Sequence, residues 1–276
     1  MGWGKEELAV LLEEGLADDE AHALRVQVAR AIPHRLSENG FRLYIHYGSD
    51  GNAAGLGFAT MTEIAAELGE GAVSLFDAEL WYSGSTLVRQ LIECGYLISL
   101  AAESREEAEK WIRSSPEEAR DWFAPGNMRN RATRDFRLEE YRVHCSRGGH
   151  PTPAGLDLLK RHADERPVDA RLSWSDLVQH LVDLWEGFCS ALPLYDPRRE
   201  EGGPLYGPDR SPDGREEVDK LLTAWRERDP LARHFGLPWT PVLGSLARSN
   251  IPNRAIRMLG CRLLGDDWAT SPKSAV

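Results

Sequence analysis

Residues 73–102 constrain the fold most, because their apolar side chains recur at the spacing of an α-helix. Positions three and four residues apart share one face of a helix, and here that face is almost entirely apolar. A helix with such a face must be covered by other elements. We therefore expect 73–102 to be the long central helix of a bundle. The residues on this face are Phe76, Leu80, Leu87, Leu91, Cys94 and Ile98.

Amphipathic patterns predict further helices on both sides of this segment. Ser104 and Ser115 each precede glutamates, a pattern typical of a helix N-terminus, and Pro116 suits a first helical position. In the same way, Ser173 and Asp176 are expected to cap a helix. The predicted helices, besides the two short ones after Ser104 and Ser115, are 5–38, 60–69, 135–148, 154–163, 174–192 and 215–228.

Glycine and proline predict where the helices stop. Asn39-Gly40 is expected to end the first helical segment, and the glycines within 41–59 predict a loop with at most a short extended piece. Residues 196–214 are rich in proline and glycine, a composition that predicts a surface loop. Residues 271–276 are expected to form a disordered tail. No alternating run is flanked by hairpin turns, so the predicted fold class is all-α: one multi-helix domain over 1–276 with irregular Pro/Gly-rich loops.

The composition of the chain limits which kinds of binding partner it can have. A net charge of −11 argues against a broad nucleic-acid surface, although a local basic cleft would be compatible with it. No stretch is apolar enough to predict a membrane span, and the N-terminus lacks a signal-peptide pattern. The four cysteines include no C-x-x-C pair, so we expect a reduced, cytoplasmic protein. We expect no cofactor, and a homodimer is compatible with the sequence.

Residues 141–151 hold the densest group of reactive side chains in the chain. If 135–148 is helical, Tyr141, His144 and Cys145 share a face, and His150 follows just beyond the helix end. Zinc accepts histidine and cysteine ligands, so a metal site of His144, Cys145 and His150 is one alternative, with Cys94 as a fourth ligand. The other alternative is that these polar side chains satisfy backbone groups around the Gly148-Gly149 turn.

Arg89 and Glu93 are charged residues within the apolar helix 73–102, four positions apart. Charges in so apolar a segment are expected to be paired or functional. The 141–151 segment is the nearest dense polar cluster that follows a helix able to pack on this one. We therefore predict that Arg89 and Glu93 meet Tyr141 and His150 in one polar pocket, with His144 or Cys145 at its rim.

Two motifs in this region resemble a group of bacterial all-helical proteins distantly similar to HEPN and abortive-infection bundles. Arg89-x-x-x-Glu93 within Ser85–Leu97 is similar to their core helix, and Tyr141-x-x-His144-Cys145 followed by Gly-Gly-His150-Pro151 is similar to their second segment. The resemblance covers about residues 73–155. It implies an all-α bundle and an association with cell or phage defence or nucleic acid. His144 stands where the second pattern usually has an apolar residue.

The spacing of Arg137 and His144 also fits the R-x(4–6)-H pattern of HEPN-type ribonucleases. In that chemistry histidine moves protons at the ribose 2′-hydroxyl, and arginine stabilises the charged phosphate. Leu138 departs from the polar residue usual after the arginine.

Three functions therefore remain open at the level of sequence. The first is a non-catalytic binding or scaffold role with an RNA or protein partner. The second is RNA cleavage by an Arg/His pair, with His150, Arg89, Tyr141 and His144 as candidate catalytic residues and Glu93, Cys145 and Arg137 around them. The third is a metal-dependent enzyme at the His144, Cys145 and His150 segment.

Overall fold

The computed structural model describes residues 14–132, 138–151, 153–159, 166–195 and 212–235. Helices and short turns make up these residues, and no strand occurs among them. The predicted all-α bundle is therefore confirmed for the described part of the chain. Within the same residues, no helix has the length and apolar character needed to cross a membrane.

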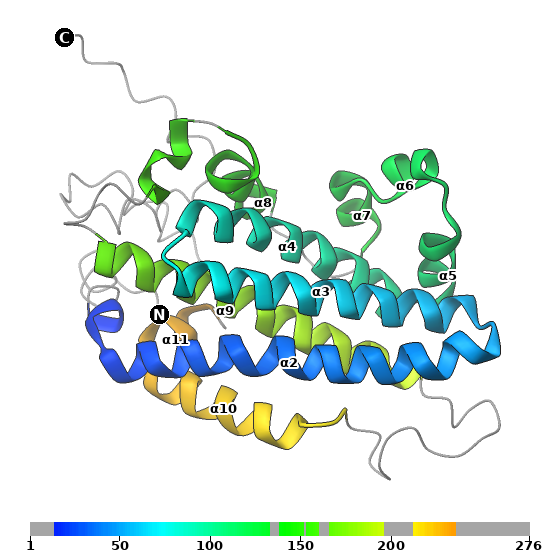
Figure 1. The fold of residues 1–276 in the computed structure, drawn as a ribbon, viewed down its shortest axis with the longest axis horizontal. Helices are drawn as coiled ribbons and strands as arrows, with labels where there is room; N and C mark the ends of the chain where they lie inside the picture. Colours follow the sequence, from blue (N-terminus) through cyan, green and yellow to red (C-terminus); the bar gives the residue numbers. More distant parts are fainter. Residues whose placement is uncertain (1–13, 133–137, 152, 160–165, 196–211, 236–276) are drawn as a thin grey trace, which may run out of the picture.

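Four long helices form the bundle, and its core lies between them (Figure 1). The most extensive contacts among them follow the cyclic order α2, α3, α4 and α9, and α3 also contacts α9 across the core. Aromatic rings from three parts of the chain stack at one end of this core, where Phe58 lies 4.2 Å from Tyr195 and 5.6 Å from Phe188, centroid to centroid. The bounds of the four helices are Asp19–Asp50 (α2), Ala53–Asp77 (α3), Trp81–Glu103 (α4) and Arg166–Ala191 (α9).

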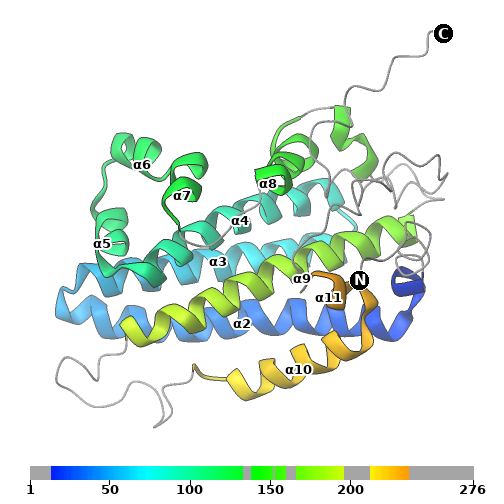
Figure 2. The same cartoon turned by 180° about the vertical axis from the view of Figure 1, so that it is seen from behind.

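Helices α4 and α9 are neighbours that run in the same direction (Figures 1 and 2). Their early residues Ser85 and Ser173 line one cavity, and late in both helices Gly187 lies against Ile98. A parallel pair needs a long return connection, and several short helices supply it across α4. These elements are α5 (Arg105–Arg113), α6 (Pro116–Trp122), α7 (Pro125–Arg131), α8 (Leu138–His144), a π-turn η1 (Cys145–Gly149) and a 3₁₀ turn η2 (Pro153–Leu158).

The chain continues after α9 through a short 3₁₀ turn, η4 (Leu192–Leu194), to α10 (Arg215–Arg228) and α11 (Pro230–Phe235). Helix α10 packs on α2, and a buried ion pair fastens the two. The guanidinium of Arg25 donates to both carboxylate oxygens of Asp229, at 2.6 and 2.7 Å, and both side chains are fully buried. Arg25 also donates to the carbonyl of Gly15, and Trp225 Nε1 donates to Asp229.

The predicted single helix 73–102 is wrong, because the chain turns sharply between α3 and α4. Ala78, Glu79 and Leu80 form this turn, and Glu79 has a φ of 58°, in the left-handed region. Leu80, placed on the apolar face by the sequence pattern, is 45 % exposed at the N-cap of α4. Among the remaining stripe residues of α4, Leu91 and Ile98 are fully buried, Cys94 is buried and Leu87 is half-buried.

The predicted loop over 41–59 is also wrong, because α2 continues through Asn39-Gly40 to Asp50 and α3 begins at Ala53. Only Gly51, with a φ of 67°, ends a helix here. Gly55 instead permits close packing of helices, since a Cβ at this position would lie 2.4 Å from the ring of Tyr47. Tertiary packing thus outweighs the low helix propensity of these glycines.

Several predicted helix ends are confirmed. Ser104 caps α5 through Glu106 N–H, Ser115 and Glu118 form a capping box at α6, and 215–228 matches α10. Helix α9 begins earlier than expected, so Ser173 and Asp176 lie inside it instead of capping it. Ser175 donates to the carbonyl of Arg171, an i−4 bond that lets a serine stay within a helix. The expectations for 5–13, 135–137, 160–163, 196–211 and 271–276 lie outside the described residues.

Burial of Cys94 gives the fold a weakness at high pH. Cys94 is 6 % exposed on α4, and burial raises the pKa of its thiol from 9.0 to about 12. The unfolded chain ionises this thiol above pH 9 and the folded chain does not, so the free energy of unfolding falls as pH rises from about 9 to about 12. At about pH 10.5 the loss from Cys94 alone is about 2 kcal/mol.

Urea unfolding at about pH 8 and about pH 10.5 tests this expectation. Wild type and Cys94→Ala are compared, and the variant should lose less stability between the two pH values, by about 2 kcal/mol. Equal losses in the two proteins would show that the Cys94 thiol does not couple folding to pH.

Candidate metal centre

His144 is held at the point where the return connection meets the start of α4. It ends α8, and the π-turn η1 that follows packs directly on α4. A Cβ at Gly148 would lie 2.9 Å from the backbone of Ser85, so glycine is needed for this approach. The hydroxyl of Thr86 donates to the carbonyl of Gly148 at 2.6 Å and anchors the turn. The His144 side chain is thereby directed inward and is 6 % exposed.

Helix α9 presents Asp176 and His180 toward His144. The two residues are four positions apart and so share one face of the helix. Leu177 and Leu181, which flank them in sequence, are fully buried in the core. Packing of these leucines against the bundle fixes the rotation of α9, and that rotation brings the carboxylate and the imidazole to the edge of the core nearest η1.

Three ligand atoms from these side chains converge. Nε2 of His144 lies 3.2 Å from Nε2 of His180 and 3.5 Å from Oδ1 of Asp176, and the distance from His180 Nε2 to the same oxygen is 3.3 Å. The two imidazole rings meet edge to face, with centroids 5.1 Å apart. Both histidines are about 6 % exposed and Asp176 is 16 % exposed, so the triangle is almost enclosed.

This triangle has the dimensions of one face of a tetrahedral metal site. Ligands at about 2.0–2.1 Å from a tetrahedral ion lie about 3.3–3.4 Å from one another, whereas neighbouring ligands of an octahedral ion of similar bond length lie about 3.0 Å apart. The three observed distances centre on the tetrahedral value. Among the described residues, the clustered histidine, cysteine and carboxylate side chains that could hold a metal ion are these three.

A small cavity lies beside the triangle. His144 and Asp176 contribute to its wall together with Ser85 from α4, Arg147 and Gly148 from η1, and Ser173 from α9. Its volume is about 20 Å³, which is room for a single water molecule. Val143, Leu158 and Leu172 complete the lining.

The polar pocket predicted from sequence forms in part, on the other side of the α8–η1 segment. Arg89 donates to Glu93 at 2.6 Å, and the hydroxyl of Tyr141 donates to the same carboxylate oxygen at 2.6 Å. Burial and the Glu93 carboxylate raise the pKa of the Tyr141 hydroxyl, and the neighbouring Cys145 thiol also raises it, which keeps this hydroxyl a donor. These contacts fasten α8 to α4.

Three other predicted site residues do not join that pocket. The side chain of His150 is exposed, and its carbonyl accepts from the hydroxyl of Tyr82 at 3.0 Å. His144 points to α9, and Cys94 belongs to the main core. Arg137 lies outside the described residues. The structure thus brings His144 together with Asp176 and His180, where the sequence suggested Cys145 and His150 as its partners.

Sequence patterns alone do not identify Asp176 and His180 as site residues. Asp176 fits the pattern of a helix cap, and His180 has no metal-ligating side chain near it in sequence except Asp176. The signal was the Asp176-x-x-x-His180 spacing, which places two ligand types on one helical face. Its partner His144 is 36 residues away, so only the tertiary fold identifies the group.

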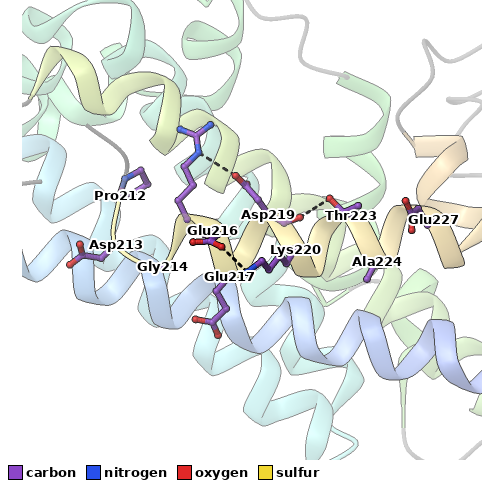
Figure 3. Close-up of a pocket in the computed structure, with 11 residues that line it drawn as sticks. Pro212, Asp213, Gly214, Glu216, Glu217, Asp219, Lys220, Thr223, Ala224 and Glu227 are labelled. Carbon is purple, nitrogen blue, oxygen red and sulfur yellow. Dashed lines mark hydrogen bonds and ion pairs between the residues drawn. The ribbon is translucent and has the colours of Figure 1, made fainter. Parts of the chain in front are cut away.

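A second hollow follows the outer face of α10 (Figure 3). Its acidic side chains are exposed, and two of them are paired along the helix: Glu216 with Lys220 at 2.7 Å and Asp219 with Arg215 at 3.3 Å. Such pairs are typical of a solvated helix face and give this hollow no chemistry of its own.

Comparison of the chain with protein-family models, with curated proteins and with solved structures finds no match. The interpretation of the site therefore depends on its own geometry.

Proposed function

We propose that this protein binds one divalent transition-metal ion, zinc in the first place, through His144, Asp176 and His180. The observation that carries the proposal is the triangle of two imidazole nitrogens and one carboxylate oxygen, with sides of 3.2, 3.3 and 3.5 Å. Imidazole and carboxylate are common zinc ligands. A cation beside this triangle would be coordinated by all three atoms, and the carboxylate of Asp176 would offset one of its two charges.

Zinc is favoured over iron by the distances. Two histidines and one carboxylate also hold iron(II) in many oxygenases, where the ion has octahedral geometry. The separations here suit a tetrahedral ion better, because octahedral coordination would require the three side chains to close by about 0.3 Å. Elemental analysis distinguishes the two ions, so iron is an alternative outcome of the test.

The geometry supports metal binding better than RNA cleavage by His144. A histidine that moves protons at a ribose must reach the RNA, and the His144 side chain is 6 % exposed behind η1. The relation to HEPN-like bundles and a binding or scaffold role in the cytoplasm remain compatible proposals, since a buried metal ion can also fasten a scaffold.

Elemental analysis and metal titration of the full chain test the proposal. After chelation and dialysis, wild type should take up one equivalent of zinc. His180→Ala should lower the affinity at least ~100-fold, since loss of a direct ligand exceeds the effect of losing an outer partner. Uptake below one equivalent, or equal affinity of wild type and His180→Ala, would contradict the proposal.

Two control variants separate this site from the alternatives. His34→Ala removes an exposed histidine of α2, which is paired with Glu38, and should leave zinc affinity unchanged. Cys145→Ser removes the neighbour of His144 that the sequence suggested as a ligand, and should also leave affinity unchanged. A large loss in Cys145→Ser would restore the ligand set expected from sequence.

A further inference from the structure

We infer that the metal ion keeps one coordination position open to the small cavity, where a water molecule binds and exchanges with small anions. The inference rests on the metal site proposed above. Structural zinc sites are closed by four protein ligands, whereas zinc sites that activate water have three protein ligands and an open position. The described residues supply three ligands, and a small cavity lined by two of them adjoins the triangle.

The cavity adjoins the His144–Asp176 side of the ligand triangle, and we infer that the fourth position opens into it. Its wall includes two of the three ligand residues, His144 and Asp176, so it reaches the triangle. Its volume of about 20 Å³ accepts one water or a small anion and excludes a fourth side chain. Ser85 and Ser173 are among its lining residues, and a serine hydroxyl can hydrogen-bond to a water.

The metal ion and Arg147 would favour ionisation of that water, and the carboxylate of Asp176 would oppose it. Arg147 lines it from η1, while Asp176 and the two imidazoles belong to the ligand triangle on α8 and α9. Helix α4 contributes Ser85, and η2 contributes Leu158, neither of which is charged. A zinc ion brings the pKa of bound water from about 9 in solution to about 7 in such sites. On ionisation this water would release one proton to solvent, and hydroxide would remain as the fourth ligand.

Cobalt(II) in place of zinc tests the open position by absorption spectroscopy, because its visible bands report the number and kind of ligands. Addition of azide to the cobalt-loaded full chain should change these bands with saturation, as one anion replaces the water. Without azide, the bands should titrate with one proton and a midpoint near neutral pH. The spectrum is recorded on the folded protein and needs no substrate.

Two serines on α9 provide a matched pair of variants. Ser173 lines the cavity and Ser175 does not, although both are buried. Ser173→Val places methyl groups in the space of one water, so it should weaken azide binding at least ~10-fold while one equivalent of cobalt still binds. Ser175→Val should bind azide as wild type does.

The outcomes separate the two proposals. If cobalt does not bind, the metal site itself fails. If cobalt binds at one equivalent and its spectrum responds neither to azide nor to pH, the metal site stands and the open position is wrong. An equal loss of azide binding in both serine variants would also overturn the assignment of the cavity.

Discussion

Asp229→Ala is expected to destabilise the protein by about 3–5 kcal/mol, because it leaves the guanidinium of Arg25 buried without its carboxylate. Both side chains are fully buried, and Asp229 also accepts from Trp225 Nε1 and from the backbone N–H of Leu231. A single substitution therefore removes partners from three donors at the junction of α2, α10 and α11. Urea unfolding followed by circular dichroism measures the loss.

Asp77→Ala is the matched control for this prediction. Asp77 pairs with Arg30 at 2.9 Å, but these side chains are 45 % and 57 % exposed. Exposed pairs contribute little, so the expected loss is below about 1 kcal/mol. Similar losses in the two variants would show that burial does not determine the strength of the Arg25–Asp229 contact. Replacing both Arg25 and Asp229 by apolar residues should recover much of the stability lost in Asp229→Ala.

Leu91→Asp is expected to cost at least about 5 kcal/mol, which is comparable to the whole stability of many domains. Leu91 is fully buried in the core on α4, so the substitution removes a packed side chain and places a carboxylate among apolar residues. Burial would raise the pKa of this carboxyl, so the defect should become smaller as pH falls and the acid becomes neutral. Thermal and urea unfolding at two pH values measure both effects.

Leu80→Asp provides the comparison within the same sequence pattern. Leu80 is 45 % exposed at the N-cap of α4, where no side chain caps the helix. An aspartate there can accept from the first helical N–H groups, so we expect no loss and a gain of up to about 1 kcal/mol. A loss near that of Leu91→Asp would favour the uninterrupted helix 73–102 over the observed turn. Leu91→Met, which conserves volume, should cost less than about 1.5 kcal/mol.

The sequence predicts the fold class well because helix signals are local. Serine caps, the apolar stripe of α9 and the charge pattern of α10 depend on residues within a few positions of one another. The predicted helix ends are wrong where a glycine permits close packing of two helices. Gly55 fits against Tyr47 inside the bundle, so it does not mark a loop. The turn at Glu79 is not predicted for the opposite reason, because no glycine or proline lies at this position to indicate a turn.

The candidate site is predicted only in part, because some of its contacts join residues close in sequence and others join residues that only the tertiary fold brings together. Arg89 and Glu93 are four positions apart on one helix, and their pairing is readable from spacing. Tyr141 reaches them as expected. His144 instead contacts His180 on α9, and the π-turn that follows it and packs on α4 is not visible in a pattern of residue types. Its partners lie on α9, in a contact that only the packing of parallel helices creates.

The parallel course of α4 and α9 implies an order of events during folding. Helices α2, α3 and α4 follow one another through short turns, so their pairing closes small loops and can be fast. Helix α9 can dock only after the chain between Glu103 and Arg166 has returned across α4, a closure of much larger sequence separation. His144 and His180 meet at that late moment. The rate at which refolding chains acquire tightly bound cobalt should therefore match the slowest phase seen by circular dichroism and lag behind the gain of most helix.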